Sequence, residues 1–376
     1  LVLGLRDEGR LDLDEPIRAH LPALPVGVVT PRQLLAHVSG LRREPAGPWW
    51  ERSPGVDVPT LLAAITPDAA VHRPGRTYHY SNLGYGLLGA LVATITGGSW
   101  ADAIEARICA PLGLSRTTYA PAPPYLPGFV VHPYADRVRE EPREDAGAMA
   151  PAGQIWSTVA DLGRWAAFIA QPTVTSPASE VLSAATVEEM CVPVAIGDLE
   201  SWSEGHSLGF QMWRVGHSVY LGHTGSMPGY LAVLMMHRPS RTAVVAFANA
   251  YSLGRFSIAA LGKELLAAVL DGEPEEPPTW TATESPAEIE PLLGAWWWMG
   301  DTFELTWDGG LAMFAAGRTG MTPWRFTRVG PDEWRCHSGM NDGETMYVLR
   351  DTTGTAVELD IATFIFSRDP WPAVVR

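Results

Sequence analysis

The chain has 376 residues, of which 46% are hydrophobic and 18% are charged, and its formal net charge is −15 at pH 7. This is the composition of a globular protein with a large core, and it excludes a largely disordered chain. The negative charge argues against nucleic acid and against an anionic membrane surface as partners, because both would repel it.

The first part of the chain is predicted to be mostly helical. Residues 1–9 read as one face of a helix already under way, so we expect the sequence to begin inside an element. Thr30 is predicted to cap a short helix that has Pro31 in its first turn. Asn82 is predicted to cap the long apolar helix that follows it, and Gly97 to end that helix.

Strands are predicted later in the chain, after two more helices that capping signals at Ser99 and Thr158 open. The three expected strands span residues 217–225, 230–238 and 242–250. A turn at Pro239-Ser240 separates the last two strands. A helix over residues 253–270 closes this part of the chain, which therefore combines α and β elements.

The composition changes after residue 270. Residues 271–288 are rich in proline and acidic side chains and are predicted to be a linker between a first domain, 1–270, and a second, 289–376. Beyond the linker, alternating segments separated by turn signals indicate a small antiparallel β domain, a barrel or a sandwich. The run Trp296-Trp297-Trp298 is interpreted as packing or capping this domain.

One segment matches a known hydrolase motif, G-x-S-x-G, at Gly205-His206-Ser207-Leu208-Gly209. A nucleophile elbow needs a helix after the serine, but the residues that follow are predicted to be a strand. We therefore interpret the match as accidental. An α/β-hydrolase that uses Ser207 stays an alternative, which a helix directly after Ser207 would favour.

Metal and disulfide chemistry find little support in the sequence. The three cysteines are far apart and odd in number. The ten histidines show no H-E-x-x-H spacing and no close pair backed by carboxylates. His37 is interpreted as a structural residue at a helix end, and Trp50 as lining a cleft rim or packing in the core. We predict no metal or organic cofactor, and no apolar run reaches the length of a membrane span.

Tyr80-Ser81-Asn82 would by itself be an ordinary helix start, but it occurs with four other segments in a fixed order. These are LDLDEPIRAHLP (11–22), TPRQLLAHVSGL (30–41), PAGQIWSTVADLGRWAAFI (151–169) and GHTGSMPGY (222–230). Together they resemble the penicillin-recognising serine hydrolases related to class C β-lactamases, with D,D-peptidases, D-aminopeptidases and esterases among their kin. The resemblance covers nearly all of residues 1–270.

The resemblance implies a β-lactamase/transpeptidase-like α/β (α+β) fold. An antiparallel sheet would be flanked by helices beside an all-helical subdomain, and a barrel-like β domain would follow at the C-terminal end. It also implies a serine hydrolase that forms an acyl-enzyme without a cofactor. The expected partner is a small-molecule or peptide substrate.

The same resemblance assigns roles to individual residues. Tyr80 would act as general base and acid, and Asn82 would hydrogen-bond the substrate amide. His223-Thr224-Gly225 would be the strand motif that lines one wall of the cleft, and the backbone N–H of Ser226 would be one oxyanion donor.

One departure from the family pattern is large. The family nucleophile and its lysine lie in S-x-x-K, but the only lysine here is Lys263, with Ala260 three residues before it. We expect the motif upstream of Leu1 and predict that the chain as written forms no acyl-enzyme.

A histidine at position 223 in place of lysine offers less positive charge at neutral pH, so esters and D-amino-acid amides or peptides are expected to be better substrates than β-lactams. A non-catalytic relative that serves as a binding or scaffolding module stays open as an alternative.

Overall fold

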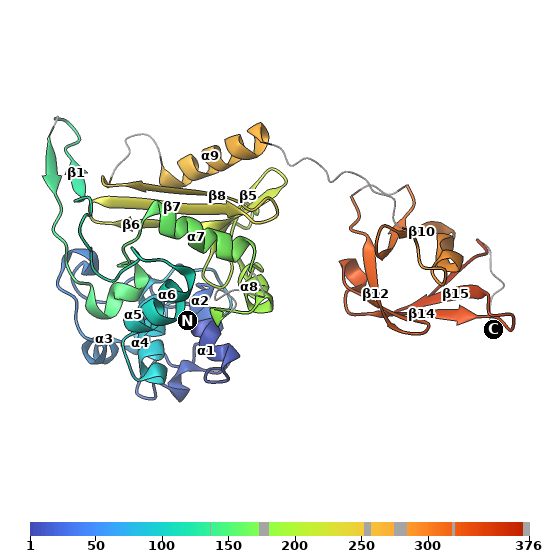
Figure 1. The fold of residues 1–376 in the computed structure, drawn as a ribbon. Coiled ribbons are helices and arrows are strands. Elements are labelled where there is room, and N and C mark those ends of the chain that lie inside the picture. Colours follow the sequence, from blue (N-terminus) through green and yellow to red (C-terminus); the bar gives the residue numbers. More distant parts are fainter. Residues whose placement is uncertain (136, 173–179, 252–256, 274–283, 318–319, 371–376) are drawn as a thin grey trace. The chain divides into compact units, whose positions relative to one another are not determined.

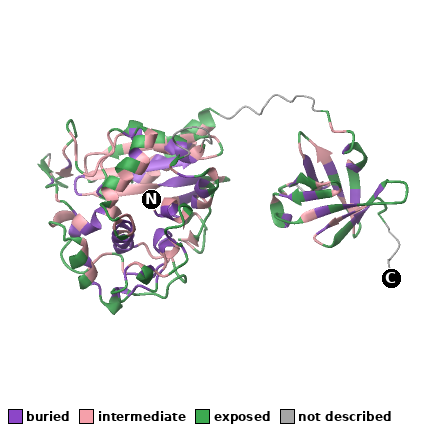
Figure 2. Ribbon diagram, turned by 60° about the horizontal axis from the view of Figure 1, so that its bottom comes forward, coloured by how far each residue is buried: buried purple, intermediate pink, exposed green. Residues whose placement is uncertain are grey.

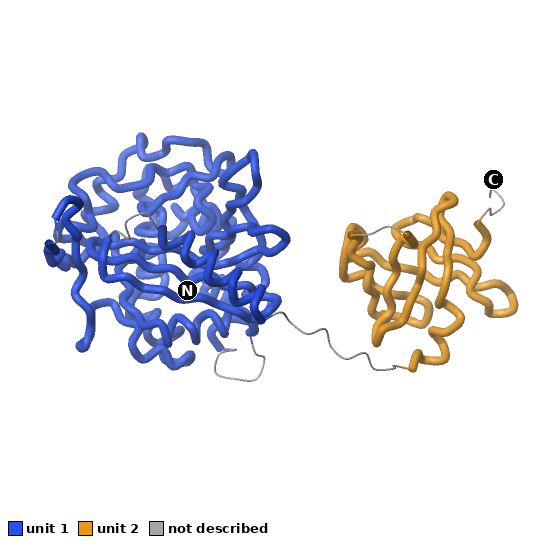
Figure 3. The backbone as a smooth tube through the Cα atoms, turned by 90° about the horizontal axis from the view of Figure 1, so that it is seen from above, with its two compact units in different colours: residues 1–275 blue, residues 276–376 orange. Residues whose placement is uncertain are grey.

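The computed structural model describes residues 1–376 except 136, 173–179, 252–256, 274–283, 318–319 and 371–376 (Figure 1). The chain divides into two compact units, residues 1–275 and 276–376 (Figure 3). Most of the predicted linker, residues 274–283, lies outside the described residues. Each unit is described by itself.

The first unit is built around a six-stranded antiparallel sheet with the order β3-β4-β5-β6-β7-β8. Its strands are β3 (Ala195–Ile196), β4 (Glu204–His206), β5 (Gln211–Val215), β6 (Ser218–Met227), β7 (Tyr230–His237) and β8 (Thr242–Ala248). The last three confirm the strands expected from the sequence, including the turn at Pro239-Ser240. A separate hairpin pairs β1 (Phe129–Val131) with β2 (Val138–Glu140).

Helices cover both faces of this sheet (Figure 1). Helix α9 packs on one face over a cluster that includes Trp213, Val233 and Leu266, and α7 and the helical part of the unit pack on the other face. In Figure 2 the buried residues gather where the helices meet the strands. Side chains along β6 and β7 point alternately to the two faces of the sheet, so each strand contributes both to the cluster under α9 and to the core on the other face.

The helices of the first unit are mostly short. They are α1 (Val2–Asp7), α2 (Pro31–Leu35), α3 (Val58–Ala64), α4 (Asn82–Thr96), α5 (Trp100–Ile104), α6 (Ala110–Leu112), α7 (Val159–Ala170), α8 (Ala184–Met190) and α9 (Ile258–Gly272). The unit also contains the 3₁₀ segments η1 (Ile17–Ala19), η2 (Trp50–Arg52), η3 (Pro67–Ala69) and η5 (Gly147–Ala152), and the π-helical segment η4 (Glu105–Cys109). Thr30 and Gln33 form a capping box on α2, as the sequence predicts for its start. Of the predicted helix 253–270, residues 253–256 lie outside the described residues.

Helix α4 is the central helix of the helical part and is buried along most of its length. A Cβ atom at Gly89 would lie 2.2 Å from the Pro151 side chain, so only glycine lets η5 approach α4 this closely. Gly97 ends the helix in the left-handed conformation with φ 74°, as the sequence predicts. Within the described residues, no single helix is both long and apolar enough to span a membrane, although the sharply bent pair formed by residues 82–96 and 100–112 meets those criteria when taken together.

The second unit is a closed antiparallel barrel with the order β10-β11-β12-β13-β14-β15-β16-β9. Its strands are β9 (Gly294–Trp298), β10 (Asp301–Trp307), β11 (Leu311–Ala315), β12 (Trp324–Gly330), β13 (Glu333–Cys336), β14 (Thr345–Arg350), β15 (Ala356–Ile361) and β16 (Phe364–Ser367), with turns η7 (Glu290–Leu292) and η8 (Gly339–Asn341). Trp296 is fully buried and donates its indole N–H to the Leu292 carbonyl at 2.8 Å. Trp296 therefore packs the core of this barrel and the half-buried Trp298 packs against it. The α/β fold with a C-terminal β barrel is confirmed.

Candidate active site

The start of α4 differs from the sequence prediction by one residue. Ser81 is the N-cap, because its Oγ accepts the Gly84 N–H at 3.0 Å and donates to the Arg42 carbonyl at 2.7 Å. The prediction that Asn82 caps the helix was therefore wrong. Asn82 is instead the first helical residue, and its side chain donates from Nδ2 to Glu44 Oε1 at 2.9 Å.

Tyr80 lies close to the H-T-G segment that is predicted to line one wall of the site. Its ring stacks on His37 with 4.1 Å between the ring centroids, and it lies 6.0 Å from the ring of His223. Burial raises the pKa of Tyr80 to about 12, and the neighbouring Tyr78 adds to this, while the Arg43 guanidinium, 5.7 Å from the Tyr80 ring, opposes it. Tyr80 is thus a neutral phenol at neutral pH, and it would need a nearby cation that lowers this pKa before it could accept a proton as a base.

The H-T-G segment forms the far half of β6. Pairing with β5 ends where Gln211 meets Gly222, so among the described residues no strand pairs with that edge of β6 from His223 onward. The Thr224 N–H points to this edge, because it donates to the side chain of Gln211 at 3.0 Å. Backbone N–H groups alternate in direction along a strand, and Ser226 therefore presents its N–H to the same open edge.

His223 is a neutral residue within this wall. Burial lowers its pKa, and its Nδ1–H donates to the Thr224 carbonyl at 2.5 Å. A Cβ atom at Gly225 would come no closer than 3.4 Å to its nearest neighbour, the side chain of Ala232. A side chain at position 225 would therefore meet Ala232 only at ordinary van der Waals distance.

A cavity of about 850 Å³ adjoins this strand. Its lining includes Gly225, Ser226 and, from a different segment, Glu51. Aromatic side chains form another part of the lining, namely Tyr119, Tyr125, Trp156, Tyr230 and Phe247. Trp156 contacts two of them edge to face, with 5.8 Å between its ring centroid and that of Tyr125 and 5.1 Å to that of Tyr230. A cavity of this size with an aromatic wall suits a ligand that carries a bulky apolar group.

Two carboxylates lie near Tyr80, and two neighbouring tryptophans orient them. Trp50 is buried and donates its indole N–H to Glu44 Oε2 at 2.8 Å, whereas Trp49 is exposed and donates to Glu51 Oε2 at 3.0 Å. Burial raises the pKa of Glu51, and the negative charge of Glu44 adds to this. Both carboxylates also raise the pKa of Tyr80. A positively charged ligand group at this place would relieve the repulsion.

The structure does not support the alternative based on Ser207. Ser207 is fully buried, and its Oγ faces the carbonyl of Phe210 at 3.4 Å. Strand β5 follows it, not a helix, so the strand–serine–helix geometry of a nucleophile elbow is missing. The interpretation of the G-x-S-x-G match as accidental agrees with this geometry.

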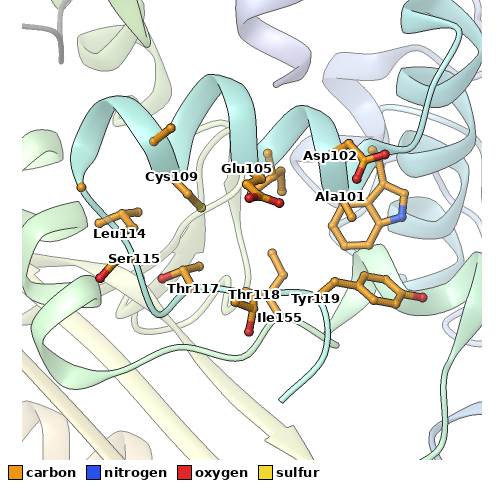
Figure 4. Close-up of a pocket in the computed structure, with 14 residues that line it drawn as sticks. Ala101, Asp102, Glu105, Cys109, Leu114, Ser115, Thr117, Thr118, Tyr119 and Ile155 are labelled. Atoms are coloured by element: carbon orange, nitrogen blue, oxygen red, sulfur yellow. The ribbon is translucent and has the colours of Figure 1, made fainter. Parts of the chain in front are cut away.

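A second cavity, of about 330 Å³, lies between the α5–α6 segment and the loop that follows it (Figure 4). None of the predicted site residues lines this cavity. Cys109 is buried beside Glu105, and burial raises the pKa of its thiol, so it is a poor nucleophile. We assign this cavity no part in the chemistry.

Sequence reasoning missed a group of three histidines. Ring nitrogens of His37, His206 and His223 lie within 4.8 Å of one another. The three residues are 17 or more positions apart along the chain, so no motif spacing could reveal them. His37 was interpreted as structural, and it does hold two segments together, since its Nδ1 accepts the Ser81 N–H at 3.0 Å.

Comparison with known proteins adds to this geometry. The family described as "Beta-lactamase" matches residues 1–269, and "Domain of unknown function (DUF7586)" matches residues 285–368. Penicillin-binding protein 4 of Amycolatopsis lactamdurans is 30% identical over 320 residues, which cover 79% of this chain and 80% of that protein.

Two solved structures show related folds. A D-stereospecific amidohydrolase from Streptomyces sp. is 27% identical with a TM-score of 0.55, and the match covers 66% of this chain and 78% of that one. The octameric penicillin-binding protein homologue from Pyrococcus abyssi is 21% identical with a TM-score of 0.61, and the match covers 97% of this chain and 84% of that one.

Proposed function

The chain belongs to the beta-lactamase family, and on this premise we propose that its first unit is the larger part of a serine hydrolase. The enzyme would act through an acyl-enzyme on amides, esters or peptides of D-amino acids. The observation that carries this proposal is that the ring of Tyr80 lies 6.0 Å from the ring of His223, on the part of β6 whose edge is open, beside a cavity that Ser226 lines.

The proposal needs a nucleophile from outside the 376 residues. The chain contains no S-x-x-K, since Lys263 is its only lysine and Ala260 stands three residues earlier. We place the serine and its lysine in a segment upstream of Leu1. The lysine would lower the pKa of Tyr80, because a nearby cation opposes the effect of burial, which raises the pKa of this phenol to about 12.

The described residues would then fill the remaining catalytic roles. The substrate carbonyl oxygen would accept the Ser226 N–H at the open edge of β6, together with the N–H of the nucleophile itself. Tyr80 would pass a proton from the serine to the leaving group, and later from water to the serine. Asn82, held by Glu44, would keep the substrate amide in line between the two walls.

The charges around the site favour a substrate with a free amine. His223 is neutral and offers no fixed positive charge for a substrate carboxylate. Glu44 and Glu51 place negative charge near Tyr80; Glu44 pairs with the Arg43 guanidinium at 3.2 Å, and Glu51 lines the cavity. An ammonium group would bind these carboxylates through charge-assisted hydrogen bonds. The aromatic wall would accept the side chain of the same amino acid.

A matched pair of substrates tests this proposal. We expect the protein, produced with its upstream segment, to hydrolyse D-phenylalanine p-nitroanilide about 10-fold or more faster in kcat/KM than the N-acetylated compound, because a charge-assisted hydrogen bond contributes about 1.5–3 kcal/mol. Equal rates for the two compounds, or faster turnover of a cephalosporin than of either, would contradict the proposed substrate class.

A second candidate function is a non-catalytic binding module. The specific observation in its favour is the missing S-x-x-K motif within the 376 residues. The two candidates separate on one point: the upstream coding sequence contains S-x-x-K if the protein is an enzyme, and lacks it if the fold serves only to bind.

A further inference from the structure

The three histidines behind the cleft come from three different segments. His37 follows α2, His206 ends β4, and His223 belongs to the H-T-G segment of β6. His37 and His206 are 1% and 0% exposed. The rings of His37 and His206 are 4.7 Å apart, and those of His206 and His223 are 6.1 Å apart. This polar cluster lies beside Tyr80, because the Tyr80 ring stacks on His37.

The hydrogen bonds of each ring fix where its proton lies. The Ser81 N–H donates to His37 Nδ1 at 3.0 Å, so His37 carries its proton on Nε2. His206 and His223 each donate Nδ1–H to a backbone carbonyl, at 2.8 Å and 2.5 Å, so each has a lone pair on Nε2. Burial lowers the pKa of His37 to about 2 and that of His206 to about 4, which keeps both rings neutral.

The cluster therefore offers one N–H donor and two nitrogen acceptors. Within the described part of the chain, His37 Nε2 and His206 Nε2 are buried and have no hydrogen-bond partner. Buried polar atoms in native proteins are almost always paired, with protein or with bound water. A water molecule matches this set of groups, because it can accept one hydrogen bond and donate two.

The proton on His37, and not the spacing of the nitrogens, separates a water oxygen from a metal ion. Three atoms that all lie within 4.8 Å of one another have a central point at most about 2.8 Å from each, and this limit admits an ordinary N···O hydrogen bond. A zinc ion needs nitrogens at about 2.0–2.1 Å, and the proton on His37 Nε2 would point at the cation. We infer that His37, His206 and His223 form a binding site for one water molecule and not for a metal ion.

This water links the two walls of the cleft. Through His37 it reaches the segment that carries Tyr80 and Ser81, and through His223 it reaches the carbonyl of Thr224 on β6. The site is a consequence of the fold alone and does not depend on the proposed reaction. Its effect is to hold the tyrosine wall and the H-T-G wall at a fixed separation.

Two measurements on the 376-residue protein test the inference. Imidazole nitrogen chemical shifts should show the Nε2-protonated form for His37 and the Nδ1-protonated form for His206 and His223. Magnetic relaxation dispersion of water oxygen should detect long-lived water, and the signal should fall by one molecule in His206→Phe but not in His217→Phe, whose histidine lies exposed in the turn before β6.

A titration with Co²⁺ completes the test, and the inference predicts no bound metal. Stoichiometric Co²⁺ binding that His206→Phe abolishes would overturn it, since the site would then be a metal centre. A wild-type protein with no long-lived water, or one in which His37 is protonated on Nδ1, would also overturn it. The chemical shifts and the wild-type dispersion require no substitution, so an unfolded His206→Phe variant leaves both outcomes decisive.

Discussion

Replacing Tyr80 with phenylalanine is expected to lower kcat of the hydrolase, produced with its upstream segment, by about 10²- to 10⁴-fold, the usual contribution of a positioned acid–base group. The substitution removes the hydroxyl that carries the proton and retains the ring that stacks on His37. The melting temperature should therefore change little. Initial rates with D-phenylalanine p-nitroanilide and a thermal unfolding curve measure the two effects.

The matched control is Tyr85→Phe. Tyr85 also stacks on His37, with 5.1 Å between the ring centroids, but its hydroxyl donates to the backbone carbonyl of Leu35 at 3.1 Å. Loss of that bond should reduce stability by about 0.5–1.5 kcal/mol and leave kcat within a few-fold of wild type. If Tyr80→Phe retained most of the activity, or if both variants lost the same amount, Tyr80 would not be the proton carrier.

Glu44→Gln is expected to have the second-largest effect, and mainly on substrate selection. The change removes the negative charge at nearly constant size, so kcat/KM for the free-amine substrate should fall by about 10- to 100-fold, as expected for a lost charge-assisted hydrogen bond. The N-acetylated substrate should be affected less. The preference for the free amine should therefore largely disappear.

The ratio of the two substrates is the informative readout. Glu44 also accepts hydrogen bonds from Asn82 and Trp50, and a glutamine amide cannot accept both, so some activity is lost for every substrate. That loss cancels in the ratio. Glu140→Gln, which changes an exposed carboxylate on β2, serves as control and should leave the ratio unchanged. A preference that survives Glu44→Gln would assign amine recognition to Glu51 or to neither residue.

Local sequence signals predicted the elements that carry the site. The N-cap at Thr30, the glycine stop at Gly97 and the strand that contains His223 all follow from neighbouring residues, and the structure contains each of them. The cap of α4 was missed by one residue because serine and asparagine are equally good caps. Only the tertiary contact with Glu44 decides that Asn82 points away from the helix end.

Long-range contacts account for the rest of what the sequence could not show. Nothing in the spacing of His37, His206 and His223 indicates that their rings meet, because the sheet brings His206 and His223 near each other and the packing of the helical part adds His37. The pKa of Tyr80 also depends on long-range contacts. The sequence shows only a tyrosine, whose pKa is ordinarily about 10, and burial in the folded protein raises this pKa to about 12.

Intact-mass analysis after treatment with a fluorophosphonate probe tests the proposed hydrolase most directly. The protein that includes the segment upstream of Leu1 should gain one adduct per molecule, on the serine of S-x-x-K, and should lose it when that serine is replaced by alanine. The 376-residue chain should gain none. A stoichiometric adduct on the 376-residue chain, at Ser207 or elsewhere, or an extended protein that gains no adduct, would contradict the proposal.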